Sequence, residues 1–339
     1  MRIASRRLDL DGRVFVVAEI GNNHDGSVRQ AERLIEAAAE SGADGVKFQT
    51  HIADAEMLPS APTPPHFDEP RYELTKRMEL SLDDHLSLKR AAEERGLVFF
   101  SSPFSVEAVE LLEEVDVPLY KIASGEVSNP PLLEAVAATK KPVLLSSGMS
   151  GLPDVEGAMA VFRFTHSQVV VLQCTSTYPC PPEAVNLRAM VAMGHALGVP
   201  YGISDHTSGI NVSVAAVALG ATVVEKHFTL SKRLYGPDHG ASLEPHELKG
   251  LVDGVREVEA ALGSGAKERE AAQDAVRATF EKSVVSAHAI PVGTELTASM
   301  LTTKRPGTGI PASRLPELLS RRAARDIRAN VLIEERDLV

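Results

Sequence analysis

Short apolar runs rich in β-branched residues recur through the first two thirds of the chain, and each is followed by a stretch with helical periodicity. The eight runs are Val14–Glu19, Gly45–Gln49, Val98–Ser101, Leu119–Ile122, Val143–Leu145, Val169–Gln173, Tyr201–Ile203 and Thr222–Glu225. Strands that alternate with helices predict parallel crossover connections. Eight such units suit a (β/α)8 barrel, which typically takes about 250 residues. We therefore predict an α/β fold built on a TIM barrel.

The first predicted helix has both a start signal and a stop signal. Ser27-Val28-Arg29-Gln30 has the pattern of a capping box, in which the Ser hydroxyl and the Gln side chain each satisfy a backbone donor. Gly42 suits the left-handed conformation that ends many helices. Later helices are predicted over Leu82–Glu94, Val106–Val115, Leu132–Thr139, Leu187–Leu197, Val212–Leu219 and Pro245–Leu262.

Two segments depart from this alternation. Leu8–Val14 contains an Asp-Gly pair and is interpreted as an N-terminal β-hairpin that could plug the bottom of the barrel. A long excursion between Gln49 and Val98 is rich in proline from Pro59 to Pro70. Loops of this length in a compact domain are usually functional or disordered. In a barrel, this one would follow the second strand, at the active-site end.

The pattern changes after Leu262. A stretch with Gly and Ser followed by charged residues indicates a linker, which we place at residues 266–282. From Ser283 onward, short β runs and turns prevail, and Ile290–Leu301 and Ile327–Leu338 share a weak apolar pattern. We predict a catalytic barrel over residues 1–265 and a small β-rich domain with faint internal duplication over residues 283–339. Such a small domain buries little core by itself.

The charge balance excludes one class of partner. The chain has 35 basic and 46 acidic residues, giving a formal net charge of −11, whereas a nucleic-acid binder usually has the opposite balance. If the substrate is an anion, the positive charge must be concentrated in a pocket. The two cysteines, Cys174 and Cys180, are expected to be reduced thiols. We find no apolar stretch long enough for a bilayer and no secretory signal, and therefore expect a cytoplasmic protein without a membrane partner.

Polar residues at the predicted strand ends are the candidates for chemistry, because a TIM barrel gathers its active site there. Lys47 and Gln49 share one face of the second strand by the period of two, and Lys121 begins the polar end of the fourth. Lysines together with Ser and Thr hydroxyls suit a phosphate or a carboxylate. A lysine at a strand end can instead extend to solvent. Several convergent polar groups favour an anion site.

Two histidines close neighbouring predicted strands, His206 after the seventh and His227 at the eighth. Imidazoles placed in this way can share a divalent metal such as Mn²⁺, although a single histidine is more often a hydrogen-bonded structural residue. Glu19 is buried by its apolar context, so it could orient substrate, bind metal through water or pair with a lysine. Asp238 follows the eighth strand and is a further candidate, whereas Glu244 is expected to start the last helix.

Nine motifs in this order resemble the sialic acid synthase family, also called N-acetylneuraminate synthases. They are Ala18–Gly26, Val46–Gln49, Ser101–Phe104, Lys121–Glu126, Leu145–Met149, Cys174–Pro179, Ser204–Thr207, Glu225–Thr229 and Gly236–His239. Ser283–Val339 is similar to the SAF domain, the fold of type III antifreeze proteins. The resemblance covers nearly the whole chain and implies a homodimer in which each SAF domain caps the active site of the other subunit.

The reaction that the resemblance implies joins phosphoenolpyruvate to open-chain N-acetylmannosamine, or a related N-acetylated amino sugar, and releases phosphate. Residues implied for phosphoenolpyruvate are Lys47, Ser102, Lys121, Ser124, Ser146, Ser176 and Ser204. Those implied for the sugar are Gln49, Tyr178, Asp238 and, from the partner chain, Arg305. Glu19, His206 and His227 are implied as catalytic, and the two histidines would bind a divalent metal, Mn²⁺ before Mg²⁺ or Co²⁺.

Several alternatives are open at this point. Synthases for legionaminic and pseudaminic acids share the framework and would use a diacetamido hexose. An octulosonate-phosphate synthase would need a second phosphate site, and the sequence shows no spare basic cluster for one. A non-catalytic carbohydrate-binding scaffold would have no need of both lysines and both histidines. Ser176 and Ser102 stand where some family members have Asn and Thr, and both keep a polar group.

Overall fold

The computed structural model describes residues 2–3, 6–7, 12–63, 69–165 and 168–339. The chain divides into two compact units, Met1–Gly263 and Ser264–Val339. In the first, eight parallel strands close into a barrel, in which each strand pairs with the next and β10 returns to β3. The strands are β3 Phe15–Gly21, β4 Gly45–Thr50, β5 Val98–Pro103, β6 Tyr120–Ile122, β7 Val143–Ser146, β8 Val169–Cys174, β9 Tyr201–Asp205 and β10 Val223–His227. The predicted TIM barrel is confirmed.

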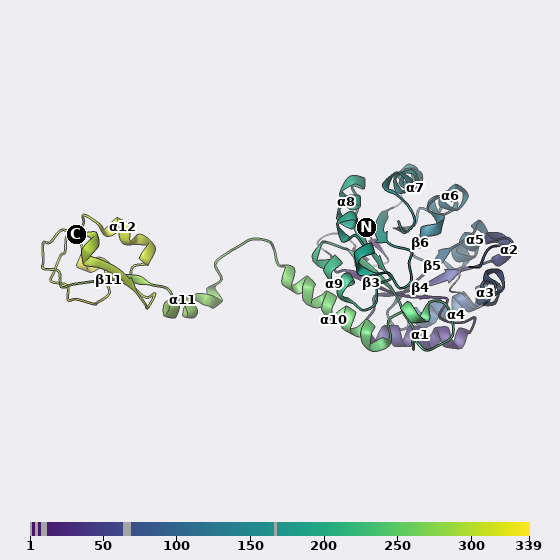
Figure 1. Ribbon diagram of the computed structural model, residues 1–339, viewed down its shortest axis with the longest axis horizontal. Coiled ribbons are helices and arrows are strands. Elements are labelled where there is room, and N and C mark those ends of the chain that lie inside the picture. Colours follow the sequence, from purple (N-terminus) through teal and green to yellow (C-terminus); the bar gives the residue numbers. More distant parts are fainter. Residues whose placement is uncertain (1, 4–5, 8–11, 64–68, 166–167) are drawn as a thin grey trace. The chain divides into compact units, whose positions relative to one another are not determined.

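Helices surround the barrel and cover the outer faces of its strands (Figure 1). They are α1 Val28–Glu40, α2 Ala53–Glu56, α3 Arg71–Met78, α4 Leu82–Glu93, α5 Val106–Val115, α6 Pro130–Ala138, α7 Leu152–Thr165, α8 Leu187–Leu197, α9 Asn211–Ala218 and α10 Pro245–Leu262. Their buried apolar faces and the outward side chains of the strands form one large core cluster. Within the described residues, no helix is long and apolar enough to cross a membrane.

The start of α1 agrees only in part with the predicted capping box. The Ser27 hydroxyl accepts a hydrogen bond of 3.3 Å from the Gln30 backbone N–H, as expected. The Gln30 side chain, however, donates to the Asn23 carbonyl at 2.6 Å instead of returning to the cap. That bond ties the helix to the loop after β3, which carries part of the site described below. Gly42 has the positive φ, +84°, expected of a left-handed stop.

Three other expectations differ from the structure. Helix α7 was not predicted, although its buried Val155, Ala158, Met159 and Phe162 follow helical spacing. The Pro-rich excursion after β4 contains α2 and α3, and so is partly helical.

The third concerns the N-terminal hairpin. Part of the predicted hairpin, Leu8–Asp11, lies outside the described residues, and Gly12–Val14 is not a strand. The antiparallel pair in this region joins β1 Arg2–Ile3 to β2 Arg6–Arg7.

The barrel interior has two layers, because each strand turns alternate side chains inward. The lower one, which we call the apolar layer, consists of Phe15, Val17, Phe100, Leu119, Leu144, Val170, Leu172 and Val223. Inward positions nearer the carboxyl ends of seven barrel strands are polar and also buried, and we call them the polar layer: Glu19, Lys47, Ser102, Lys121, Ser146, Ser204 and Glu225. The fold thus places charged groups on top of a dry apolar plug.

The second unit has its own small core. It contains η4 Ala271–Gln273, α11 Asp274–Phe280, β11 Ser283–Ser286, β12 Leu301–Lys304 and α12 Leu315–Leu318. The two strands pair antiparallel. Buried apolar residues from Val284 to Leu338 pack together around them.

The internal duplication predicted for this unit is visible in its main-chain bonds. Ile290 and Ile327, the first residues of the two similar segments, donate to each other's carbonyls at 2.8 and 2.9 Å. Matching positions repeat the same bonds across this centre: Ser286 to Val331 corresponds to Ala323 to Thr294, both at 3.0 Å. The two halves are therefore related by an approximate two-fold axis, and each half pairs with the other.

Candidate active site

The carboxyl ends of the barrel strands surround a cavity of about 400 Å³. Every candidate that the sequence placed in the barrel lines it: Glu19, Lys47, Gln49, Ser102, Lys121, Ser124, Ser146, Ser176, Tyr178, Ser204, His206, His227 and Asp238. Strand alternation explains the gathering, since the last inward positions of parallel strands all meet at one end of the barrel. One pocket thus collects side chains from every barrel strand or from the turn that follows it.

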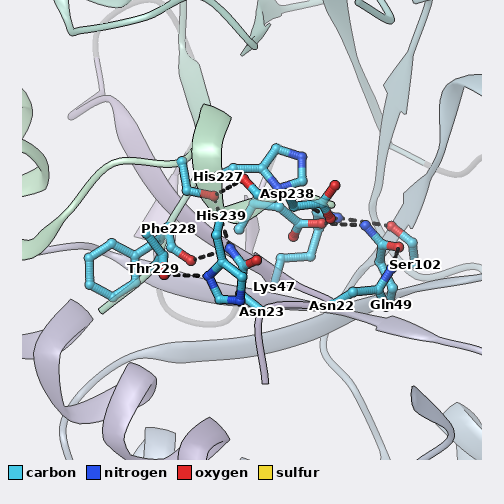
Figure 2. Close-up of polar contacts among 12 residues, drawn as sticks. Asn22, Asn23, Lys47, Gln49, Ser102, His227, Phe228, Thr229, Asp238 and His239 are labelled. Carbon is cyan, nitrogen blue, oxygen red and sulfur yellow. Dashed lines mark hydrogen bonds and ion pairs between the residues drawn. The ribbon is translucent and has the colours of Figure 1, made fainter. Parts of the chain in front are cut away.

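Two buried lysine–glutamate pairs form the base of the cavity. Lys47 Nζ lies 2.7 Å from Glu19 Oε1 and donates to Ser102 Oγ at 3.1 Å (Figure 2). Lys121 Nζ lies 3.1 Å from Glu225 Oε1. All four charged side chains are at most 5% exposed. Two ammonium groups are therefore held rigidly in one pocket, where water competes little with an anionic ligand.

The surroundings hold the two carboxyl groups in different states. Burial raises the pKa of Glu19, and the charge of Lys47 offsets this only in part. Burial acts in the same direction on Glu225, but Lys121 and Lys47 outweigh it and lower the pKa of that carboxyl. A hydrogen bond of 2.8 Å from Ser204 Oγ also stabilises the ionised form of Glu225. Glu19 is therefore the carboxyl group suited to hold a proton, while Glu225 stays ionised.

Several buried polar atoms at the cavity lack a hydrogen-bond partner within the described residues. They are Glu19 Oε2, Glu225 Oε2, Ser146 Oγ and His227 Nδ1. Leaving such atoms unpaired is costly, so their presence indicates that a ligand or water completes the site.

Two further hydroxyls are brought together by a glycine. A Cβ at Gly148, in the turn after β7, would lie 2.3 Å from both Ser124 Oγ and Ser176 Oγ. Only glycine permits this close approach of three turns. The result is a group of small donors beside Lys121, the arrangement that suits a carboxylate or phosphate.

His206 and His227 lie together on the cavity wall, with ring centroids 5.4 Å apart. His206 Nδ1 lies 2.9 Å from the Thr175 carbonyl oxygen, which only accepts, so in the neutral ring Nδ1 carries the proton and Nε2 keeps its lone pair. Burial acts to lower the pKa of His206, but its contacts with Cys174 and the Thr175 carbonyl outweigh burial and raise that pKa. Burial lowers the pKa of His227 to about 4 and keeps that imidazole neutral. The Tyr178 ring lies 4.1 Å from the His206 ring, and Asp238 Oδ2 lies 4.0 Å from His227 Nδ1.

These two imidazoles fit a divalent metal. Both can offer a neutral nitrogen, and His227 Nδ1 is buried without a partner in the described part of the chain. The described residues contain no group of three or more His, Cys, Asp or Glu arranged to hold an ion. A metal bound by His206 and His227 would therefore take its other ligands from water or substrate.

Three residues that orient the site were not predicted from the sequence. His51 Nε2 lies 3.1 Å from Gln49 Oε1, and His51 Nδ1 lies 3.0 Å from both carboxylate oxygens of Glu56. Gln49 Nε2 then donates to Glu19 Oε1 at 2.9 Å. The His51 ring also stacks on Phe104, with centroids 4.4 Å apart. Glu56, His51 and Phe104 thus fix the amide that contacts Glu19.

Arg71, Glu126 and Glu225 also line the cavity and were not assigned a role. Glu225 could have been found, because it stands two residues before His227 and so shares its inward face. Glu126 ends η1 Ser124–Glu126, two residues after Ser124, which was predicted to bind the anion. Arg71 begins α3 in the excursion, where no periodic signal marked it.

Arg305 belongs to the second unit. Its Nε donates to the Phe280 carbonyl at 3.0 Å, and its guanidinium lies 5.5 Å from the centre of the Phe280 ring. Its contact with the sugar stays a prediction. Both cysteines are free thiols, as expected, and Cys174 lines the cavity with its Sγ 3.9 Å from His206 Nδ1.

The site agrees with what sequence comparison finds. The profile described as NeuB family matches residues 34–267, and that of the SAF domain matches residues 281–339. The chain belongs to the NeuB family. It is 40% identical over 332 residues to the N,N'-diacetyllegionaminic acid synthase of Campylobacter jejuni, which covers 95% of this chain and 99% of that protein.

Two further NeuB-family similarities cover most of the chain. The human N-acetylneuraminate-9-phosphate synthase is 41% identical over 309 residues, 89% of this chain and 85% of that protein. The crystal structure of the N-acetylneuraminic acid synthetase from Leptospira borgpetersenii, in complex with citrate, matches with a TM-score of 0.71 and 34% identity. That match covers 78% of this chain and 90% of the Leptospira chain.

As a NeuB-family member, the protein is a phosphoenolpyruvate-dependent nonulosonic acid synthase. Its substrates are phosphoenolpyruvate and an acetamido sugar, and enzymes of the family depend on a metal.

Proposed function

We propose that the acetamido sugar is open-chain, unphosphorylated N-acetylmannosamine, so that the products are N-acetylneuraminic acid and phosphate. The observation that carries this proposal is the charge of the cavity. Its lining has three permanent cations, Lys47, Lys121 and Arg71, against the four carboxyl groups of Glu19, Glu126, Glu225 and Asp238. Both lysines are already paired with glutamates. Even with Glu19 protonated the lining has no net positive charge, so a second phosphate on the sugar would add uncompensated negative charge to that of phosphoenolpyruvate.

A diacetamido hexose, the substrate of a legionaminic or pseudaminic acid synthase, is the second candidate. Leu74, Phe104 and Met149 give the cavity an apolar wall against which a second acetyl methyl group could pack. The 40% identity to the Campylobacter jejuni synthase favours the same candidate.

We assign the anion-binding groups to phosphoenolpyruvate. Lys47 and Lys121 would neutralise its carboxylate and phosphate, and hydroxyls would donate to the remaining oxygens: Ser102, Ser124, Ser146, Ser176 and Ser204. Gln49, Tyr178 and Asp238 would position the sugar. His206 and His227 would hold Mn²⁺, with Mg²⁺ or Co²⁺ as alternatives, and a bound ion would supply Lewis acidity toward the aldehyde.

The chain's own residues account for the proton movements. The C3 methylene of phosphoenolpyruvate attacks the aldehyde carbon. Water then adds at C2 and returns a proton to the Glu19 carboxylate, and the C2–O bond breaks as phosphate leaves with the proton of the new C2 hydroxyl. Glu19 can give a proton to the aldehyde oxygen as it becomes a hydroxyl, because burial favours its protonated form. Glu225 stays ionised and holds Lys121 in place. The fixed charges stabilise the transition state without reorganising.

We further propose that residues 266–282 link the barrel, residues 1–265, to the SAF domain, residues 283–339, in a domain-swapped homodimer. Arg305 of the partner subunit would then contact the sugar. Exposed Val276 and Val292 give the second unit apolar surface that a partner could cover.

The sugar is identified by measuring phosphate release with Mn²⁺ and phosphoenolpyruvate. N-acetylmannosamine, its 6-phosphate and two diacetamido hexoses are compared, and products are weighed by mass spectrometry. We expect the highest kcat/KM with N-acetylmannosamine and at least a tenfold lower value with the phosphate. Preference for the phosphate or for a diacetamido hexose would replace the proposed substrate by that one.

The swap is tested by mixing two inactive variants, Lys121→Met and Arg305→Ala, under conditions that exchange subunits. In a swapped dimer, an intact barrel from one subunit meets an intact Arg305 from the other, so mixing restores activity. Without a swap, no site has both residues and activity stays at the level of the parents. Arg322→Ala is the control in the same unit, because Arg322 pairs with Glu295 on the surface.

A further inference from the structure

Directly behind the two histidines lies an ion pair that the proposed reaction does not use. Lys226 Nζ is 2.9 Å from Asp205 Oδ2, and both side chains have no exposed surface. Asp205 Oδ2 also accepts a hydrogen bond of 2.6 Å from Ser213 Oγ, at α9. Lys226 is the largest charged side chain among those that are fully buried. A charge pair at this depth gains little net stability, because desolvation offsets the attraction.

The position of the pair follows from strand alternation. Lys226 and Asp205 are register partners on neighbouring strands β10 and β9 and point outward, away from the cavity. His227 directly follows Lys226 in β10, and His206 directly follows Asp205 at the end of β9. Both histidines line the cavity. The ion pair therefore joins the two strands at the point where each presents its imidazole.

The pair also fixes the backbone on both sides of His206. Asp205 Oδ1 accepts from the Thr207 backbone N–H at 2.8 Å, and Lys226 Nζ donates to the Thr207 carbonyl at 2.5 Å. The His206 carbonyl itself accepts from the Cys180 N–H at 2.8 Å. Because His206 follows the last residue of β9, these bonds replace the strand ladder that would otherwise hold it.

We propose that Asp205 and Lys226 are positioning residues that set the separation of the His206 and His227 imidazoles and thereby the affinity for the metal. This inference rests on the proposed two-histidine metal site. A metal with two protein ligands takes its remaining ligands from water and substrate. The separation of the two imidazoles is therefore the part of the coordination geometry that the protein must fix. Second-shell residues of metal sites commonly change metal affinity by about 10- to 100-fold when replaced.

The test uses the full chain and removes both charges together, in Asp205→Leu/Lys226→Met, so that no unpaired buried charge is left. Mn²⁺ binding is measured without substrates, by electron paramagnetic resonance of the free ion. We expect Mn²⁺ affinity to fall 10- to 100-fold. The affinity for phosphoenolpyruvate, measured by calorimetry without metal, should change less than threefold. The single variant Lys226→Arg keeps the charge and should retain most of the Mn²⁺ affinity of the unmodified protein.

The matched control is a second ion pair, between buried Asp44 and partly buried Arg256, at the opposite end of the same barrel. Asp44 lies before β4 and accepts from Arg256 Nη2 at 2.5 Å and from the Val16 N–H at 2.9 Å. Asp44→Leu/Arg256→Met should bind Mn²⁺ as the unmodified protein does. If Asp205→Leu/Lys226→Met also binds within threefold of the unmodified protein, the positioning role is overturned.

A separate variant distinguishes failure of the inference from failure of the site on which it rests. His206→Ala removes a proposed ligand directly and should abolish tight Mn²⁺ binding. Unchanged binding by His206→Ala would overturn the two-histidine site itself, and the positioning role with it. Loss of binding by His206→Ala, together with full binding by the double variant, would reject the positioning role alone.

Discussion

The two layers inside the barrel come from the same strands, yet they do opposite things. The apolar layer is a plug of aromatic and aliphatic side chains such as Phe100 and Leu144. One inward position further along, the polar layer buries charged side chains such as Lys121 and Glu225. Both layers are almost fully excluded from solvent, so burial alone does not separate them. The two layers differ in whether the protein itself provides all the contacts and hydrogen bonds that their side chains need.

The apolar layer is complete, because its side chains pack together without polar atoms and need no ligand. The polar layer is incomplete, since Glu19, Glu225 and Ser146 each keep an unpartnered oxygen. Within the barrel interior, the apolar layer therefore contributes mainly to stability and the polar layer mainly to ligand binding. Because the apolar layer below is well packed, the strand ends can carry unpaired polar groups, which would destabilise a hydrophobic core.

The largest expected effect of a change in the polar layer is that of Lys121→Met on activity. The change removes one of the two ammonium groups at the base of the cavity and leaves Glu225 without its partner. We expect kcat/KM for phosphoenolpyruvate to fall at least about 1000-fold, or roughly 4 kcal/mol, since a charged hydrogen bond and an electrostatic contact are both lost. Steady-state phosphate release measures it. Lys76→Met, on the surface of α3, is the control and should leave kcat/KM unchanged.

Leu144→Ala tests the lower layer. Leu144 is fully buried in the apolar layer, and its truncation should reduce the free energy of unfolding of the barrel by about 2–5 kcal/mol. Activity of the folded enzyme should change only a few fold, because Leu144 does not line the cavity and supplies no polar group to it. Urea denaturation and phosphate release give the two readouts. A loss of kcat/KM as large as that of Lys121→Met would show that the layers are not separable.

A smaller effect concerns acid sensitivity near the upper end. Burial lowers the pKa of His24, in the loop after β3, from 6.5 to about 4. Between pH 6.5 and about pH 4, His24 is protonated in the unfolded chain but not in the folded protein. Protonation of the unfolded chain lowers the free energy of unfolding, so the stability present above pH 6.5 is lost as the pH falls. At pH 5 the loss from this residue is about 2 kcal/mol.

His24→Gln should therefore reduce the difference in unfolding free energy between pH 7 and pH 5 by that amount. His246→Gln, at an exposed position, is the matched control. Leu144→Ala should keep the full pH dependence, because the apolar layer contains no titratable group. An unchanged pH dependence in His24→Gln would exclude His24 as its source.

The periodicity of the sequence predicted the barrel because eight alternating runs carry the signal independently. Strand ends were placed too early where polar residues follow, as in β9, predicted to end at Ile203 and observed to reach Asp205. Polarity indicated a loop there, but Ser204 points into the cavity and Asp205 is neutralised behind it, so the ladder continues. Helix α7 was missed because Pro153 and Gly157 interrupt an otherwise regular apolar stripe.

The sequence predicted which residues line the site, but not which of them form ion pairs with one another. Inward alternation places Lys47 and Lys121 in one pocket without any knowledge of their partners. That Lys47 contacts Glu19, and Lys121 contacts Glu225 across the barrel, depends on closure of the sheet, which brings residues 104 positions apart together. His51 and Arg71 come from the segment after β4, where the chain has no period of two to follow.

The approximate two-fold axis of the second unit has a consequence for how that unit folds. Ile290 and Ile327 bond to each other, and bridges from Val285 to Leu332 and from Glu295 to Arg322 also join the two halves. Each half has main-chain groups that only the other half satisfies, so an isolated half gains less by becoming ordered. We expect the duplicated segments to order in a single cooperative step, and a chain that ends at Ser320 to leave the first half unstructured. Cutting the chain between the two similar segments would therefore remove hydrogen-bond partners from both of them.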